Sequence, residues 1–224
     1  MPAEIIIKPR RETSVTDEQL FCLTRESYQM WIDHGLLSEW RDFTAEDYER
    51  FCRHVHRASV FVALDAATGE LLGMHCLVAD RRHRCVRGSG LAVSPRAQHR
   101  GIATRLLQFE ERRMVGAGYR YLTGRTAVGA IWSVNWHLRN GYHIIGYKRS
   151  PKDNHYSYEF RKQLVPSLLW DSALFCRCCY LASYAITKLT KDSNGRPNLV
   201  GRVLKKMIGK SKKEAMPAHP LKSV

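Results

Sequence analysis

The segment Gln98–Ala103, with the sequence QHRGIA, constrains the fold of this chain more than any other stretch. The apolar run Leu91–Val93 precedes it and helix-patterned residues 104–110 follow it, so we expect a tight turn between a strand and a helix. The first amides of a helix have no internal partner and lie at the positive end of the helix dipole. Gly101 permits close approach of the backbone, and Arg100 adds positive charge. The turn is therefore predicted to cradle a phosphate group.

Hydrophobic periodicity predicts seven strands and four helices along residues 3–164. Thr16 with Gln19 forms a capping box at the first helix, and Thr44 caps the second. Gly88 and Gly90 indicate a bulge or a close backbone approach. Strands are expected at residues 5–8, 60–64, 71–78, 86–93, 119–123, 143–148 and 156–164, and helices at 16–35, 44–52, 102–116 and 130–140. This order predicts a mixed α/β sheet with helices on both faces.

Two motifs in this order resemble the GNAT superfamily of acyl-CoA-dependent N-acyltransferases. Gln98, Gly101 and Ala103 match its phosphate signature Arg/Gln-x-x-Gly-x-Gly/Ala. Residues 136–142 (WHLRNGY) are similar to its helix-to-strand motif, which ends in Tyr-x-x-x-Gly-Phe. The resemblance implies a GNAT fold, with a mixed, mostly antiparallel seven-stranded sheet and about four flanking helices. Neither a Walker A loop nor an early GxGxxG turn is present.

The resemblance also implies acetyl-CoA as co-substrate and no metal. Backbone groups at Leu91, Ala92 and Val93 would hold the pantetheine arm. Ser133 stands where the family has a small alanine, and Ala130 replaces an asparagine that touches pantetheine. The expected cofactor-binding residues are Leu91, Ala92, Val93, Gln98, His99, Arg100, Gly101, Ile102, Ala103, Thr104 and Ser133.

The resemblance leaves the proton-transfer groups less defined. His137 occupies the position of the family's thiolate-protonating tyrosine, and an imidazole can donate a proton near neutral pH, so we expect a general acid there. The alternative is an ordinary packed helical histidine. No carboxylate lies in residues 86–93, where the family often places its base. His75, His83 and His155 are candidates for that role, although each is also readable as structural.

Residues 165–224 are predicted to form a basic, helical extension beyond the domain at 1–164. They hold eleven Lys or Arg against three Asp or Glu, within a chain of net charge +15. An anionic partner is one interpretation, and a solvated basic tail is the other. Asp171 and Arg177 interrupt the apolar run after Pro166, which favours a helix in the membrane interface over a spanning helix. Two alternatives for the extension are equally expected. Residues 165–213 contact an anionic membrane, or the helix packs on the domain or on a second subunit in a homodimer.

Seven cysteines without a regular framework, and no signal peptide, predict a cytoplasmic protein, with the extension peripheral at the inner face of the membrane. The expected reaction is transfer of an acetyl group from acetyl-CoA to a primary amine. An amino sugar, or a precursor of a surface glycan or lipid, would be an acceptor consistent with a membrane-bound tail. The residues expected to line the acceptor site are Trp31, Trp40, Arg41 and Tyr48. The alternatives are an acetyltransferase acting on RNA-linked or ribosomal amines, or an acyltransferase-derived module that binds membrane or nucleic acid. Base stacking is not expected, because few aromatic residues lie among the basic ones.

Overall fold

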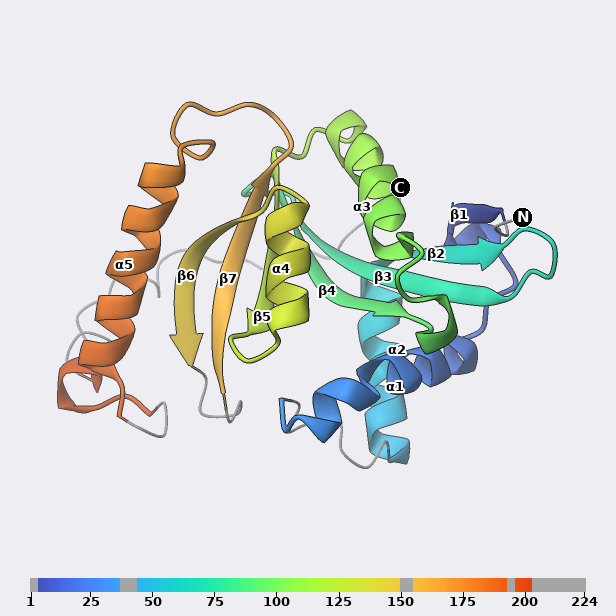
Figure 1. Cartoon of the computed structure of the whole chain (residues 1–224), viewed down its shortest axis with the longest axis horizontal. Coiled ribbons are helices and arrows are strands. Elements are labelled where there is room, and N and C mark those ends of the chain that lie inside the picture. The colour runs from blue at the N-terminus through green and yellow to red at the C-terminus, as the bar shows by residue number, and fades with distance from the viewer. Residues whose placement is uncertain (1–3, 37–43, 150–154, 193–195, 203–224) are drawn as a thin grey trace.

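One seven-stranded sheet, in the order β1-β2-β3-β4-β5-β7-β6, organises the molecule (Figure 1). The computed structural model describes residues 4–36, 44–149, 155–192 and 196–202. The strands are β1 (Ile5–Pro9), β2 (Ser59–Asp65), β3 (Leu71–Asp80), β4 (Cys85–Val93), β5 (Tyr121–Ala127), β6 (His143–Arg149) and β7 (Tyr156–Gln163). The helices are α1 (Asp17–Asp33), α2 (Ala45–Arg57), α3 (Ile102–Gly116), α4 (Ile131–Arg139) and α5 (Ala173–Thr190). Neighbouring strands are antiparallel except for β4 and β5, which are parallel. The predicted mixed sheet is confirmed.

Two hydrophobic cores lie on opposite faces of this sheet. Alternation along β2 sends Phe61 into the core beneath α3 and α4, and Val62 into the core beneath α1 and α2. On β3, Leu77 lies in the core beneath α3 and α4, and Met74 lies in the core beneath α1 and α2. Thr16 and Thr44 cap the two helices of the second core, as predicted from the sequence. The capping box predicted at Thr16 is present, and Thr44 also forms one, with Asp47, that was not predicted.

The bulge expected near Gly88 and Gly90 is present in β4. The register between β3 and β4 shifts there, so that Ser89 has no partner on β3. The hydroxyl of Ser89 instead donates a hydrogen bond to the Cys76 carbonyl, at 3.2 Å. A bulge bends its strand and raises the local twist. β4 therefore changes course at its middle, and the functional site described below lies at that bend.

Several expected element boundaries are wrong. The helix expected at 44–52 continues to Arg57. A strand was expected to begin at Tyr119, but the Tyr119 amide bonds back to the Met114 carbonyl and closes the end of α3. β5 then runs on to Ala127, because it pairs with β7 along its whole length. The C-terminal helix begins at Ala173 rather than near Pro166, because Ser172 caps it by accepting from the Phe175 amide.

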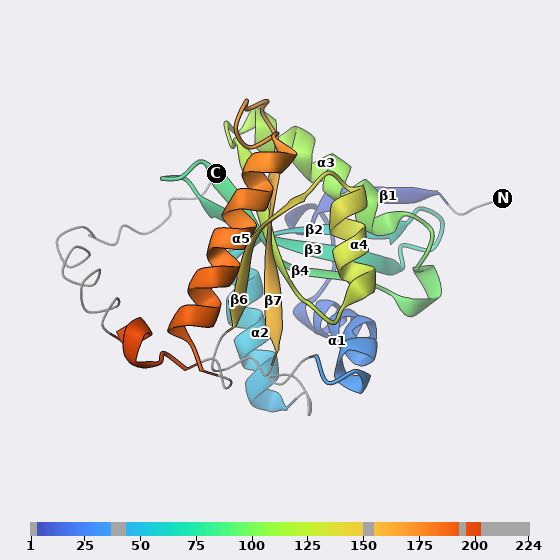
Figure 2. The ribbon, with the colours of Figure 1, turned by 60° about the vertical axis from the view of Figure 1, so that its left-hand side comes forward.

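Helix α5 covers the outer edge of the sheet. It lies beside β6 in both views, at the opposite edge of the sheet from β1 (Figures 1 and 2). The Ser183 hydroxyl accepts from the Tyr147 amide at 2.9 Å and donates to the Tyr147 carbonyl at 3.1 Å. The Thr187 hydroxyl donates to the same carbonyl at 2.8 Å. An otherwise unpaired edge strand is thereby satisfied, which prevents further strand pairing.

All the cysteines are free thiols. On α5, Cys176 is buried, Cys179 is partly buried and Cys178 is exposed. Among the described residues, no helix is both long and apolar enough to cross a bilayer.

The Ser183 contact yields a stability prediction. Ser183→Ala removes both bonds and leaves a partly buried amide unpaired, so we expect a loss of about 1–3 kcal/mol in the free energy of unfolding. Thr190→Ala, on the same helix but exposed, removes only a local bond to the Ile186 carbonyl and is expected to cost less than about 0.5 kcal/mol. Denaturant unfolding of both variants measures the difference. Equal midpoints would show that α5 does not secure the edge.

Candidate active site

The predicted phosphate turn has the expected backbone geometry. After a short 3-10 turn at Pro95–Ala97, His99 and Gly101 adopt left-handed conformations, with φ of 62° and 74°. Gly101 is the N-cap of α3, and no side chain caps this helix. A Cβ added at Gly101 would meet no atom within 4 Å. The α3 N-terminus is therefore uncapped and has open space beside Gly101, which suits the binding of an anion.

Gly73 on β3 brings this helix end close to the sheet. A Cβ at Gly73 would lie 2.9 Å from Cγ2 of Ile102 and 3.2 Å from the Ala92 carbonyl oxygen. Any larger residue would push the start of α3 outward. The position of the phosphate turn thus depends on a glycine that the sequence did not single out.

Helix α1 supplies hydroxyl groups to the backbone of β4. The Val93 amide donates to the Ser27 hydroxyl at 3.2 Å, and the Leu91 backbone hydrogen-bonds to Tyr28. Burial raises the pKa of the Tyr28 phenol above its ordinary value. Ala92 faces the core beneath α1 and α2. Two of the three residues expected to hold pantetheine are therefore already in contact with α1.

A cleft opens where β4 and β5 separate. The two strands pair only from Cys85 to Arg87 and from Tyr121 to Thr123. Beyond these residues they diverge around a cavity of about 950 Å³. Gly88 and Gly124 are the first residues past the last pair, so they lie at the point of divergence.

His137, on α4, faces this point. A Cβ at Gly124 would lie 3.0 Å from its Nε2 atom. Its Nδ1–H donates to the Ser133 carbonyl at 2.7 Å, and its ring stacks on Phe160 at 4.4 Å. Burial, reinforced by the charge of His75, lowers the pKa of His137 to about 4. The neutral ring therefore presents an Nε2 lone pair to the cleft, and it can accept a proton there before it donates one.

His75, on β3, faces the same point from the other strand. A Cβ at Gly88 would lie 2.9 Å from its Nε2 atom, and its Nδ1 lies 2.7 Å from Oε2 of Glu110. Glu110 is completely buried on α3, and its other oxygen has no hydrogen-bond partner in the described part of the chain. A carboxylate that accepts from Nδ1–H fixes the ring so that Nε2 faces the cleft.

The His75–Glu110 pair was only weakly indicated by the sequence. Glu110 follows Leu106 and Leu107 on the buried face of α3, where an acidic residue requires a buried partner. That signal identifies Glu110 as unusual. The sequence alone could not show which of the distant histidines pairs with it, since 35 positions separate the two residues.

Of the other expected residues, Ser133 and Leu91 line the cleft, whereas Gln98–Thr104 lie outside its lining. The Ser133 hydroxyl accepts from Thr126 on β5 at 3.0 Å. His155 lines the cleft, but His83 is exposed and bonds to Asp80 outside it.

Aromatic side chains form one wall of the cleft. Trp31 and Tyr28 from α1 line it, and Trp31 meets Trp132 of α4 at 5.6 Å between ring centroids. Tyr48 instead packs on Phe21 and is absent from the lining, which corrects its expected place in this wall. Trp40 and Arg41 lie outside the described residues. Within the described ranges, no three His, Cys, Asp or Glu side chains are grouped to hold a metal ion.

Solved structures share this fold. The ribosomal-protein-S18-alanine N-acetyltransferase from Escherichia coli matches with a TM-score of 0.57 at 10% identity, over 73% of this chain and 96% of that chain. An aminoglycoside 6'-N-acetyltransferase complexed with coenzyme A matches with a TM-score of 0.56 at 16% identity, over 72% and 98%. An IAA acetyltransferase from Bacillus cereus ATCC 14579 gives 0.52 at 16% identity, over 71% and 99%. At these identities the similarity establishes the fold.

No curated protein matches the sequence. The model of the acetyltransferase (GNAT) family matches residues 18–142, which is more than half of the chain and includes the phosphate turn, His75 and His137. Together with the seven-stranded sheet and the uncapped α3 N-terminus, this match shows that the chain belongs to the GNAT family of acetyltransferases, enzymes that use acetyl-CoA.

Proposed function

We propose that this enzyme acetylates the primary amine of a compact acceptor such as an amino sugar, with His75 and His137 moving the protons. The main support for this proposal is that two imidazole Nε2 atoms lie at the point where β4 and β5 separate. The Nε2 atom of His75 lies next to Gly88, and that of His137 lies next to Gly124. Gly88 and Gly124 leave room there for the two imidazole rings, because a Cβ at either position would lie 3.0 Å or less from an Nε2 atom. The aromatic wall of Tyr28 and Trp31 supports an acceptor with apolar faces and a positive charge.

The donor is held by the chain's backbone. The open α3 N-terminus from Gly101 onward suits the pyrophosphate, and Arg100 adds charge at the same turn. For β4 to hold the pantetheine arm, the hydroxyls of Ser27 and Tyr28 would have to turn away from the Val93 and Leu91 backbone.

The proton route follows from the two imidazole environments. His75, oriented by Glu110, takes a proton from the incoming ammonium group and so produces the nucleophilic amine. The nitrogen–carbonyl bond then forms as the carbon–sulfur bond breaks. His137 accepts the second proton from that nitrogen at Nε2 and passes it to the leaving thiolate. With a pKa of about 4, the protonated ring gives this proton up readily, so His137 needs no proton in the resting enzyme.

Thermal unfolding tests the donor site. The wild-type protein should gain about 2.7 kcal/mol at an acetyl-CoA concentration one hundred times its dissociation constant. Gly101→Ala should lose most of this gain, because a Cβ at positive φ strains the turn that presents the amides. Gly118→Ala is the matched control, since Gly118 also has positive φ and open space but lies at the other end of α3. No stabilisation of the wild type at millimolar acetyl-CoA would refute the acetyltransferase proposal and leave the binding-module alternative.

Turnover tests the histidines, with thiol release measured across a panel of amino sugars, polyamines and ribosomal peptides. His75→Gln and His137→Gln should each lower kcat about 100-fold, whereas KM for acetyl-CoA should change less than about threefold. Glutamine at position 75 can still donate to Glu110, so the buried carboxylate keeps a partner. His83→Gln, outside the cleft, is the control. Unchanged kcat in either cleft variant would assign that histidine a structural role.

We further propose that α5 rests on an anionic membrane surface. Its outward side chains Leu174, Leu181 and Leu189 are 73%, 59% and 66% exposed. The helix contains Arg177 and Lys188 but no acidic residue. An amphipathic helix with these features binds an interface through apolar burial and attraction to anionic lipid. A homodimer through the same leucines is the competing proposal.

Flotation with phosphatidylserine-containing vesicles tests this contact. Deleting residues 165–224 would also uncover β6, so the informative variant is the triple change Leu174→Gln, Leu181→Gln and Leu189→Gln. We expect it to abolish flotation, whereas Val115→Gln, at an exposed apolar position on α3, should float like the wild type. The homodimer would be favoured instead if the wild-type protein does not bind vesicles but has the mass of a dimer in light scattering. The triple variant would then have the mass of a monomer.

A further inference from the structure

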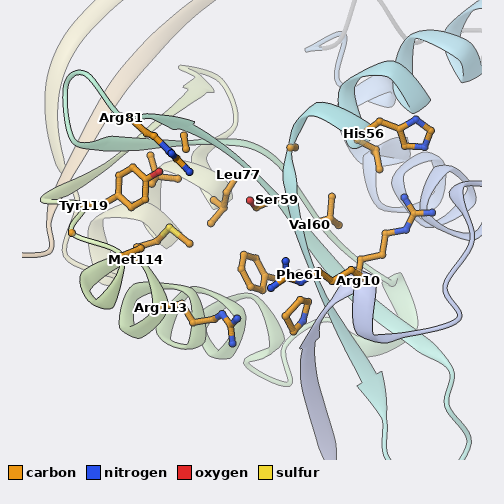
Figure 3. A pocket seen from close by; sticks show the side chains of 18 of the residues that line it. Arg10, His56, Ser59, Val60, Phe61, Leu77, Arg81, Arg113, Met114 and Tyr119 are labelled. Carbon is orange, nitrogen blue, oxygen red and sulfur yellow. The ribbon is translucent and has the colours of Figure 1, made fainter. Parts of the chain in front are cut away.

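A second hollow lies at the opposite end of α3 from the phosphate turn. It encloses about 1360 Å³ between the last turns of α3, the start of β2, the end of β3 and the β3–β4 turn (Figure 3). No residue lines both this hollow and the catalytic cleft. Its chemistry is therefore independent of the acetyl-transfer site.

The floor of the hollow is apolar. Phe61, Leu77 and Val86 are buried there, and Met114 and Tyr119 are half-buried. In Figure 3 the Leu77, Met114 and Tyr119 side chains lie between the Arg81 and Arg113 guanidinium groups. An apolar floor of this kind favours the apolar part of a ligand, because binding removes both surfaces from water.

The rim is basic. No carboxylate is among the lining residues, whereas the basic side chains that line the hollow are Arg10, Arg11, His56, Arg81, Arg84 and Arg113. In the part of the chain that the structure describes, Arg81, Arg84 and Arg113 form no ion pair with a carboxylate. The Arg113 guanidinium lies 6.0 Å from the centre of the Phe61 ring, which holds it above the floor.

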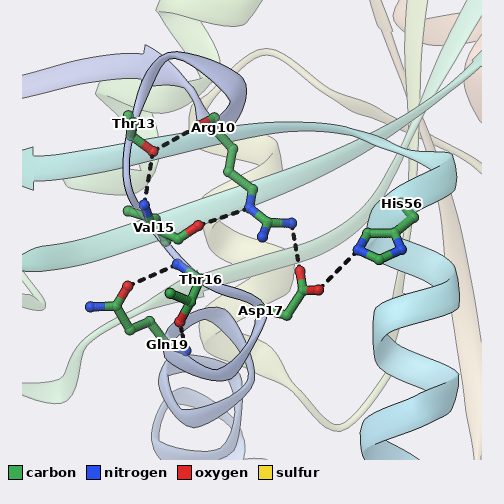
Figure 4. A network of polar contacts seen from close by, with 7 residues as sticks. All are labelled: Arg10, Thr13, Val15, Thr16, Asp17, Gln19 and His56. Atoms are coloured by element: carbon green, nitrogen blue, oxygen red, sulfur yellow. Dashed lines mark hydrogen bonds and ion pairs between the residues drawn. The ribbon is translucent and has the colours of Figure 1, made fainter.

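One end of the rim is already neutralised. Arg10 and His56 converge on the Asp17 carboxylate, at 2.6 Å and 2.9 Å (Figure 4). The Arg10 Nε–H also donates to the Val15 carbonyl at 3.1 Å. Arg10 is therefore held by its own chain, and the unbalanced positive charge is concentrated at the other end, around Arg81, Arg84 and Arg113.

The β3–β4 turn holds two of these arginines in a fixed, strained loop. Arg84 has a φ of 50°, which is rare for a residue with a side chain. The Asp80 carboxylate stabilises the turn by accepting from the His83 amide at 3.1 Å and bonding the His83 ring at 2.7 Å. Backbone strain of this kind is concentrated at functional sites.

We propose that this hollow, which we call the arginine pocket, binds a small organic anion with a phosphate or carboxylate head and an apolar body. The head pairs with a guanidinium group at the edge of the apolar floor, that of Arg81 or that of Arg113, whose planar donors match both kinds of oxyanion. The body covers Leu77, Met114 and Tyr119. Neither an inorganic ion nor a neutral apolar molecule satisfies both halves of the pocket.

Isothermal titration with decyl phosphate, below its micelle concentration, tests the pocket in the full chain. The double variant Arg81→Gln/Arg113→Gln should weaken binding at least about tenfold, since hydrogen bonds to charged groups are among the stronger ones. The matched control is Arg82→Gln/Arg112→Gln, which removes the same charge from the same turn and helix at exposed positions outside the lining. It should change the dissociation constant less than about twofold.

Three further titrations decide between outcomes. Binding that persists in saturating acetyl-CoA supports a separate pocket, whereas its loss would place the probe in the catalytic cleft and overturn the proposal. Decanoate, used in place of decyl phosphate, reveals which head is preferred. Three results would each contradict the arginine pocket. Inorganic phosphate could bind as tightly as decyl phosphate, both double variants could weaken decyl phosphate binding equally, or no probe could give heat at millimolar concentration.

Discussion

The separation of β4 from β5 after a few paired residues is the constraint on which the functional architecture depends. β4 is drawn away by its bulge at Ser89, and β5 is fully occupied by β7 on its other side. The strand backbone that faces this gap has no neighbouring strand on that side in the described part of the chain. It can therefore form hydrogen bonds with an extended ligand, as it would with a further strand. Gly88 and Gly124 lie at this gap, and the imidazole rings of His75 and His137 pack against them.

The two histidines at this gap differ in what surrounds them, and the roles that we propose for them rest on that difference. His75 is backed by the buried Glu110 carboxylate, which orients it and balances a positive charge. His137 has only the Ser133 carbonyl and the Phe160 ring, so burial lowers its pKa and keeps it neutral. In our proposal, His137 is therefore a relay that first accepts a proton, instead of the general acid expected from the sequence.

Much of this could be predicted from the sequence, because local rules govern it. The helix caps at Thr16 and Thr44, the bulge near Gly88 and the tight turn at Gly101 all follow from residue type and spacing. Contacts between distant positions could not be predicted from one sequence. The pairing of His75 with Glu110, the hydroxyl contacts from α1 to β4 and the cover of α5 over β6 each depend on tertiary packing. The predicted start of the last helix was wrong for a related reason, since a local cap at Ser172 outweighed the apolar pattern before it.

Nitrogen-15 NMR of the histidine rings during a pH titration shows directly whether His137 presents a neutral Nε2 acceptor to the cleft. We expect the His137 proton to stay on Nδ1, with Nε2 unprotonated, until the pH falls toward the pKa of about 4. Titration of His137 near the ordinary value of about 6.5, or a resting proton on Nε2, would contradict it.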